Sequence, residues 1–224
     1  MAGNSFEKEL RCRVKPDGWR HFKLIFSVLS TNESYQRPIR MLGCLNDVEA
    51  SYLEKEKLRL LGMNDVLTGL LNRAGLDWKL REREKRGFLP GQDLLVLMDV
   101  DSFKNFNDQY GHQCGDDVLI QTGRLLREQF RLEDILCRWG GDEFLLYLVG
   151  AAGHTERIAK KFAVIQETMA DYQYEGRKIP VTYSIGGTVV GDGSFEEDFK
   201  AADKSLYLVK ERGRNGILLP PERS

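Results

Sequence analysis

The chain has 224 residues, 42% hydrophobic and 30% charged, the ordinary balance of a globular protein with room for one full domain and part of another. Its formal net charge of -1 excludes an overall field that would draw it onto nucleic acid or an anionic membrane, so neither is expected as a partner. The four cysteines form no CxxC pair and no apolar run approaches the ~18 residues that span a bilayer, which predicts a soluble cytoplasmic chain. Membrane attachment of a longer parent protein stays open.

Residues 9–48 are predicted to form three short strands, Leu10–Val14, His21–Val28 and Ile39–Leu45. Turn-forming residues separate them, first Pro16-Asp17-Gly18 and then Thr31-Asn32-Glu33-Ser34. Three antiparallel strands of this kind bury little core alone. The stretch Phe6–Asp47 resembles the second half of a PAS domain, which implies that residues 1–47 are part of a sensor whose first half is missing.

A charged helix is predicted at Val48–Leu61, within a linker of residues 48–63. Its apolar residues Leu53, Leu60 and Leu61 fall on one narrow face, and so thin a stripe makes a short helix marginal alone. Two interpretations stay open. The helix pairs with a copy of itself as a parallel coiled coil, or it lies on its own domain.

From residue 64 to 219 helix and strand signals alternate, which predicts an α+β domain: a sheet that contains antiparallel strands and is flanked by helices. The expected elements are helices at Leu67–Phe88, Asp116–Phe130, Thr155–Tyr172 and Glu196–Arg212, and strands at Leu94–Asp99, Ile135–Trp139, Glu143–Val149, Ile179–Val190 and Ile217–Leu219. The Gly140-Gly141 pair is a two-residue turn signal between two of these strands.

Two acidic motifs carry the chemistry. Asp99 ends an apolar strand, where a rigid sheet can hold a carboxylate for a hard cation, although an acidic residue after a strand more often caps the next helix. Gly140 and Gly141 allow a backbone to approach a phosphate, and the adjacent Asp142 and Glu143 repel each other unless a cation lies between them. A plain surface hairpin is the alternative for this second motif.

Taken in order, the motifs of residues 65–216 resemble the GGDEF family of diguanylate cyclases. They are Asp65-Val-Leu-Thr-Gly-Leu-Leu-Asn-Arg73, Asp99-Val-Asp-Ser-Phe-Lys104, Asn107-Asp108, Gly111-His112, Gly115-Asp116, Gly140-Gly-Asp-Glu-Phe144, Ser184-Ile-Gly186, Ala202-Asp-Lys-Ser-Leu-Tyr207, Lys210 and Gly213-Arg-Asn215. The family fold is similar to the palm of polymerases and of class III nucleotide cyclases. No motif position expected to touch metal, guanine or phosphate departs from the family pattern.

By this resemblance Asp99, Asp142 and the carbonyl of Val100 are metal ligands. Glu143 either joins a second metal or helps to take the proton from the attacking 3′-hydroxyl. The reaction is attack of that hydroxyl on an α-phosphate with loss of pyrophosphate, performed twice, which suits two Mg²⁺ ions in each half-site, with Mn²⁺ as the alternative ion.

The resemblance also implies a GTP site. Asn107 and Asp116 match the guanine-reading pair, since a carboxylate can accept from guanine N1–H and N2–H. The triphosphate-binding cations of the family are matched by Lys104, Lys210 and Arg214. The nucleotide-binding loop contains His112, and the hairpin tip near the phosphates contains Gly140 and Gly141. His112 is expected to be structural rather than catalytic.

A regulatory site is implied by Arg131 and Asp134, an RxxD that five residues separate from Gly140. The product, cyclic di-GMP, is expected to bind there and inhibit; an ordinary surface ion pair is the alternative. Each subunit supplies one half-site with one GTP, so the active form is expected to be a homodimer.

The predicted function is therefore that of a metal-dependent diguanylate cyclase with product feedback inhibition. Three alternatives remain: a non-catalytic module that binds GTP or cyclic di-GMP, an interaction protein that works through its N-terminal strands and helix, and a cyclase for another nucleotide.

Overall fold

The computed structural model describes residues 5–16, 18–31, 38–85, 87 and 90–222. They fall into two compact units, Met1–Leu61 and Gly62–Ser224. No helix among these described residues combines the length and the apolar composition needed to cross a membrane.

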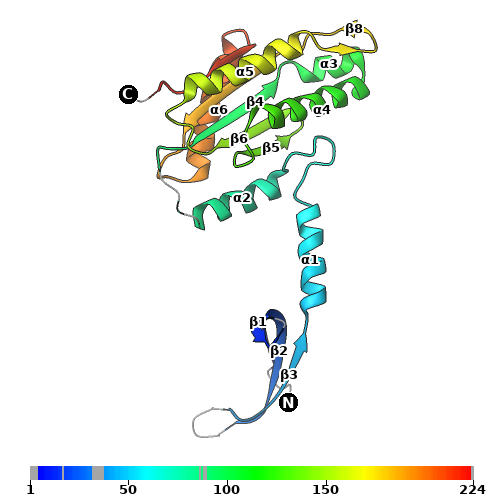
Figure 1. The fold of residues 1–224 in the computed structure, drawn as a ribbon, viewed down its shortest axis with the longest axis vertical. Coiled ribbons are helices and arrows are strands. Elements are labelled where there is room, and N and C mark those ends of the chain that lie inside the picture. Colours follow the sequence, from blue (N-terminus) through cyan, green and yellow to red (C-terminus); the bar gives the residue numbers. More distant parts are fainter. Residues whose placement is uncertain (1–4, 17, 32–37, 86, 88–89, 223–224) are drawn as a thin grey trace. The chain divides into compact units, whose positions relative to one another are not determined.

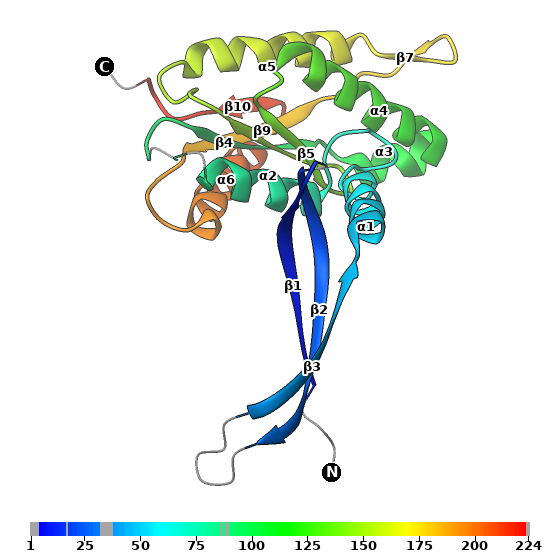
Figure 2. The ribbon, with the colours of Figure 1, turned by 60° about the horizontal axis from the view of Figure 1, so that its bottom comes forward.

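The first unit contains an antiparallel sheet of order β1-β2-β3, formed by β1 (Ser5–Val14), β2 (Gly18–Thr31) and β3 (Pro38–Asp47), followed by α1 (Glu49–Leu61). The three predicted strands are confirmed and are longer than expected (Figure 2). Asp17 and the predicted turn at Asn32, Glu33 and Ser34 lie outside the described residues.

Strand register gives this sheet one apolar face. Phe6 is paired with Phe26, Leu10 with Phe22, and Leu24 with Leu45, so these six side chains share a face. None of the side chains that the structure describes in this unit is buried, in agreement with the small core expected of three strands.

The start of α1 is tied to β2. The backbone N–H of His21 donates to the Glu49 carboxylate (2.6 Å), and the His21 and Tyr52 rings stack with centroids 3.6 Å apart. Leu53 is exposed, whereas the side chains of Leu60 and Leu61 lie outside the described residues, so a pairing of this helix with a second copy stays a prediction.

The second unit is built on a five-stranded sheet of order β10-β9-β4-β6-β5 (Figure 1). Its strands are β4 (Leu94–Val100), β5 (Ile135–Gly140), β6 (Glu143–Leu148), β9 (Tyr183–Val189) and β10 (Gly216–Leu218). Only the β9–β10 pair is parallel among these described strands, and the other pairs are antiparallel. The predicted α+β class with a sheet containing antiparallel strands is thus confirmed.

Helices cover both faces of this sheet (Figures 1 and 2). They are α2 (Arg73–Lys85), α3 (Phe103–Tyr110), α4 (His112–Gln129), α5 (Thr155–Ala170) and α6 (Phe195–Glu211). Every residue of the central strand β4 is buried, because its alternate side chains enter two different cores. Val96 and Met98 pack in the core shared with α4 and α5, and Leu95 and Leu97 pack in the core shared with α2 and α6.

Gly186 shows how closely α6 approaches the sheet. A Cβ atom built at this position of β9 would lie 2.0 Å from the backbone nitrogen of Leu206. Only a residue without a side chain allows the helix backbone to pack directly on the strand.

Several element boundaries differ from the sequence-based expectation. The helix expected at Leu67–Phe88 begins only at Arg73, because residues 64–72 form a turn in which Asp65 accepts hydrogen bonds from Thr68. The hairpin turn is Gly141-Asp142 rather than Gly140-Gly141, because Gly140 still pairs with Glu143. Helix α3 was not expected.

The strand predicted at Ile179–Val190 is shorter, since β9 begins at Tyr183. Ahead of it lies a small hairpin formed by β7 (Gln173–Tyr174) and β8 (Arg177–Lys178).

Candidate active site

The candidate site lies at the end of the central strand β4. Pairing with β6 places Asp99 opposite Glu143, and the backbone N–H of Val100 donates to the Asp142 carbonyl oxygen (3.3 Å). On its other side Asp99 is paired with Ser184 of β9. The sheet register therefore brings the two acidic motifs, which lie more than 40 positions apart in sequence, to one edge.

A cavity of about 340 Å³ opens at this edge. It is lined by Asp99, Val100, Ser102, Phe103, Lys104, Asn105, Asp142, Lys210 and Arg214. Six of these residues were predicted from sequence as metal or triphosphate ligands. Two carboxylates and three cations line one cavity, and this arrangement can hold an anionic ligand together with a cation.

The charge balance of the site is centred on Asp99, which is only 8% exposed. Burial raises the pKa of Asp99 to about 6, and the neighbouring Asp142 and Glu143 carboxylates add to this rise. The Lys210 ammonium, 2.9 Å from Asp99 Oδ2, opposes it. Burial, with a smaller contribution from the two carboxylates, therefore outweighs the stabilisation of the ionised Asp99 by Lys210, a condition that a bound cation would relieve.

The donor set fits a hard divalent cation. The Asp99 and Asp142 carboxylates and the Val100 carbonyl offer oxygen only, as Mg²⁺ prefers. Within the described ranges no group of three or more His, Cys, Asp or Glu side chains is placed to hold a metal by itself. Further ligands would have to come from a substrate or from water, which is usual for Mg²⁺ in nucleotide enzymes.

The predicted guanine-reading residues, Asn107 and Asp116, lie on α3 and α4 and are not among the residues that line this cavity. Asn107 of α3 packs against α4 so closely that a Cβ at Gly115 would lie 1.9 Å from Asn107 Oδ1. That oxygen is buried and accepts no hydrogen bond from the described residues. Asp116 and His112 are exposed in the first turns of α4. The unsatisfied amide oxygen of Asn107 therefore lies against Gly115, the residue before the exposed Asp116.

The hairpin that carries Asp142 is held by residues whose role the sequence did not reveal. Arg138 donates two hydrogen bonds to the Gly141 carbonyl oxygen (2.9 and 2.7 Å) and forms an ion pair with Asp65 (3.2 Å). Arg73 donates to the Trp139 carbonyl oxygen and lies over the Trp139 ring, with its guanidinium carbon 4.3 Å from the centroid. The ends of the Asp65–Arg73 motif therefore fasten the hairpin tip.

A place for Ser102 in the site was also not predicted from the sequence. It has a left-handed backbone (φ 56°) at the start of α3 and lines the cavity. Such a conformation is uncommon for a residue with a side chain and concentrates at functional sites. Nothing in its sequence context signals it.

The predicted inhibitory residues lie elsewhere in this unit. Arg131 forms an ion pair with Glu133 (3.1 Å). The Asp134 carboxylate accepts from the backbone N–H groups of Arg131 (2.9 Å) and Val149 (3.1 Å). Asp134 therefore shapes its own loop, whereas the Arg131 side chain is exposed.

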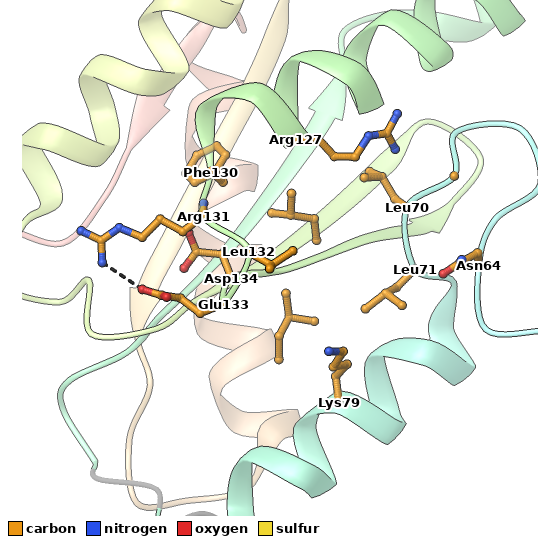
Figure 3. A pocket seen from close by; sticks show the side chains of 13 residues that line it. Asn64, Leu70, Leu71, Lys79, Arg127, Phe130, Arg131, Leu132, Glu133 and Asp134 are labelled. Carbon is orange, nitrogen blue, oxygen red and sulfur yellow. Dashed lines mark hydrogen bonds and ion pairs between the residues drawn. The ribbon is translucent and has the colours of Figure 1, made fainter. Parts of the chain in front are cut away.

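Two of the cavities at this loop include both Arg131 and Asp134 in their lining. One of about 460 Å³ lies between the loop, α2 and the residues before α2, with Leu71, Lys79 and Leu132 in its wall. Figure 3 shows Arg131 pointing away from Leu71 and Lys79 and toward Glu133. The other, about 90 Å³, is lined by both Arg131 and Asp134 and by the basic residues His154, Arg157 and Lys161. Its lining holds three cations, Arg131, Arg157 and Lys161, against the single carboxylate of Asp134. Burial lowers the pKa of Lys161, Asp134 opposes this, and the charges of Arg157 and Arg131 lower it further.

Comparison with known proteins places the second unit in a family. Residues 63–216 match the family described as "Diguanylate cyclase, GGDEF domain". Diguanylate cyclase DgcP of Pseudomonas aeruginosa is 33% identical over 173 residues, which cover 76% of this chain and 26% of that protein. Diguanylate cyclase DgcS of Shewanella oneidensis is 31% identical over 187 residues, which cover 80% of this chain and 62% of that protein. The chain thus spans less than two thirds of the length of these relatives.

Solved structures agree with this family match. The diguanylate cyclase SiaD of Pseudomonas aeruginosa, in complex with its activator SiaC, aligns with a TM-score of 0.64 at 30% identity, covering 76% of this chain and 67% of that one. The coiled coil and GGDEF domain of DgcB from Caulobacter crescentus, in complex with c-di-GMP, aligns with a TM-score of 0.65 at 25% identity, covering 77% and 93%. The family match covers most of the chain, and the chain belongs to the GGDEF-domain family of diguanylate cyclases.

Proposed function

We propose that this chain is a diguanylate cyclase, which condenses two GTP molecules into cyclic di-GMP and two pyrophosphates. The observation that carries the proposal is the single cavity where Asp99 and Asp142 meet Lys104, Lys210 and Arg214. Relatives that are 31–33% identical carry the name diguanylate cyclase and support the same reaction.

Asp99, Asp142 and the Val100 carbonyl would hold divalent metal, with two Mg²⁺ ions per half-site as the expected complement and Mn²⁺ as the alternative. Bound there, the metal would neutralise phosphate charge and lower the pKa of the attacking hydroxyl. Glu143 lies opposite Asp99 on the paired strand and is suited either to a second ion or to accepting the hydroxyl proton. The cations bind and orient the triphosphate, Arg214 as a forked donor and Lys104 and Lys210 as point charges.

Guanine would be read by Asn107 and Asp116. The unsatisfied Asn107 oxygen supports this assignment, because a buried acceptor without a partner is costly unless a ligand donor completes it. Asp116 would accept from guanine N1–H and N2–H. Gly140 and Gly141 keep the hairpin tip free of side chains near the phosphates, and His112 helps to shape the loop.

Catalysis would require two copies, because each supplies one half-site and one GTP. In this proposal residues 64–219 form the catalytic domain, residues 1–47 are part of a PAS-like sensor, and the linker at residues 48–63 helps to pair the copies. Arg131, with Asp134 holding its loop, would bind the product and inhibit. GTP as substrate favours a cytoplasmic location.

The test is incubation of the purified chain with GTP and Mg²⁺, followed by chromatography of the products. We expect cyclic di-GMP from the unchanged chain, none from Asp142→Asn, and an unchanged rate from Asp171→Asn. Asp171 is a suitable control because it is an exposed carboxylate that pairs with Lys178, away from the cavity. Activity per molecule should rise with protein concentration, since two half-sites must meet.

Three results of this test would contradict the proposed cyclase, and each would favour a different alternative. GTP binding without product at high protein concentration would favour a non-catalytic binding module. A monomer that binds no GTP would favour an interaction protein. Turnover of ATP instead of GTP would overturn the assignment of Asn107 and Asp116.

A further inference from the structure

Asp101 lies one residue beyond β4, where three parts of the chain meet. Its Oδ1 accepts from the Ser184 hydroxyl (2.6 Å). Its Oδ2 accepts from the Thr182 hydroxyl (2.8 Å) and from the backbone N–H of Asn215 (3.0 Å). One carboxylate thus joins the end of β4 and the start of β9 to the connection between α6 and β10.

That connection has an unusual backbone. Arg214 and Asn215 are both left-handed, with φ values of 66° and 46°. Asparagine adopts this conformation readily, whereas a residue such as arginine keeps it only where its surroundings hold it. Besides the bond to Asp101, two contacts hold this segment: Gln166 Nε2 donates to Asn215 Oδ1 (3.3 Å), and the Arg214 N–H donates to the Val209 carbonyl oxygen (3.1 Å). The Asp101 contact is the one among these that involves a carboxylate, and charge-assisted hydrogen bonds are the stronger kind.

Arg214 itself lines the cavity with Asp99 and Lys210. Within the described part of the chain, no ion pair of its guanidinium is found. Its position therefore depends on the backbone that carries it. Asp101 and Asp99 use their carboxylates differently. Both Asp101 oxygens accept hydrogen bonds from donors of this chain, whereas Asp99 lines the cavity.

We propose that Asp101 is a positioning residue for the triphosphate. By holding the left-handed backbone of Asn215, it presents the Arg214 guanidinium to the phosphates. This inference rests on the proposed function, since it needs a nucleoside triphosphate in the cavity.

The test is a double-mutant cycle on binding. Isothermal titration calorimetry with Mg²⁺ and guanosine 5′-(α,β-methylene)triphosphate is applied to the unchanged chain, Asp101→Ala, Arg214→Ala and the double variant. We expect Arg214→Ala to weaken binding about tenfold and Asp101→Ala about fivefold. The double variant should bind no worse than Arg214→Ala, because Asp101 acts through Arg214.

Two further variants separate positioning from general stabilisation. Asp101→Asn should bind within about twofold of the unchanged chain, because its amide oxygen can face Asn215 while its NH₂ group donates to the Ser184 hydroxyl. Thr182→Val removes one donor to the same carboxylate but leaves the Asn215 contact, so it should also stay within about twofold. If Asp101→Ala is unfolded at the assay temperature, Asn215→Gly, which frees the same backbone, replaces it in the cycle.

Independent losses that multiply to about fiftyfold in the double variant would overturn the role of Asp101 and leave the proposed function intact. If Asp101→Ala binds the triphosphate analogue as tightly as the unchanged chain, the positioning role of Asp101 is also overturned and the proposed function stays intact. A chain that binds the triphosphate but makes no product would contradict only the proposed catalysis. A chain that binds no triphosphate at all would overturn both.

Discussion

Arg138 and Asp65 form an ion pair of 3.2 Å across 73 positions of sequence, and both side chains are largely shielded from solvent. The same guanidinium donates to the Gly141 carbonyl oxygen beside Asp142. The turn that precedes α2 and the tip of the β5–β6 hairpin are therefore one hydrogen-bonded assembly.

Arg138→Lys should separate charge from geometry. A lysine keeps the positive charge but cannot contact Asp65 and Gly141 together, because it lacks the planar fork of arginine. We expect the rate of cyclic di-GMP formation to fall about tenfold while Tm falls by only a few degrees. Arg124→Lys is the matched control, since Arg124 pairs with Glu128 on the exposed face of α4. Equal rates for the two variants would contradict a role in holding the hairpin.

Asp65 should make stability depend on pH. Partial burial alone would raise the pKa of Asp65, but hydrogen bonds from Thr68 and Arg138 outweigh it and the pKa lies below its ordinary value of 3.8. The carboxylate therefore stabilises the fold fully above about pH 4, and this contribution is lost as the pH falls through the lower folded value. Asp65→Asn should lower the free energy of unfolding by about 1–2 kcal/mol at pH 7 and by less at pH 3. Urea denaturation of both proteins at each pH measures the difference, and a difference that does not change with pH would refute this account.

Asp116 should set the preference for guanine. Inosine triphosphate lacks the N2 amino group, so it offers one donor fewer to the carboxylate. The unchanged chain should favour GTP over inosine triphosphate about tenfold in kcat/KM, and Asp116→Ala should lose that preference. His112→Ala, on the same exposed start of α4, should keep it. A preference that survives in Asp116→Ala would assign guanine recognition to other residues.

Arg131 should control feedback by the product. Its side chain is exposed, so Arg131→Ala removes the cation without disturbing the core, whereas Asp134 also accepts from the backbone N–H of Arg131 and from that of Val149 after β6. Arg131→Ala should leave the initial rate unchanged and raise the concentration of cyclic di-GMP needed for half-inhibition at least tenfold. Progress curves with added product measure this, with Arg124→Ala as control. Identical inhibition of both variants would leave Arg131 as an ordinary partner of Glu133.

Gly186 should be intolerant of a methyl group. The added Cβ would lie 2.0 Å from the Leu206 backbone nitrogen, so α6 would have to move away from the sheet. We expect Gly186→Ala to lower the free energy of unfolding by about 3 kcal/mol or more. Gly153→Ala is the control, because no atom lies within 4 Å of a Cβ built there. Circular dichroism during urea denaturation compares the two.

Strong periodic signals made most of the fold predictable. The apolar run before Asp99 is a buried central strand, and the Gly140-Gly141 region is a hairpin, as expected. The turn was misplaced by one residue because local turn preferences do not reveal the pairing of Gly140 with Glu143. Helix α3 was not predicted, because eight residues give too short a window for periodicity. Its aromatic residues do recur at helical spacing: Phe103 stacks on Phe106, and the Tyr110 ring is tilted against Phe106.

The site was predictable only where a motif residue faces the cavity. Three further residues belong to these motifs or adjoin them, but their contacts are not visible in the sequence. Asp101 contacts Asn215, 114 positions away, and Arg73 contacts Trp139, 66 positions away. Arg138 contacts Gly141 across the hairpin turn. Such long-range contacts depend on the strand order, which a single sequence does not reveal. The sequence also does not predict the left-handed backbones of Ser102 and Arg214, because neither residue is a glycine or an asparagine.

The bond between Asp101 and Asn215 spans 114 positions and joins the end of β4 to the connection between α6 and β10. During translation the ribosome releases Asp99 and the hairpin well before Lys210 and Arg214, which come from the last helix and the connection that follows it. A nascent chain can therefore expose the acidic edge and Lys104 without Lys210 and Arg214, the other two cations that line the cavity. Full affinity for GTP should appear only when this connection leaves the exit tunnel, so prematurely terminated products should compete only weakly for the nucleotide.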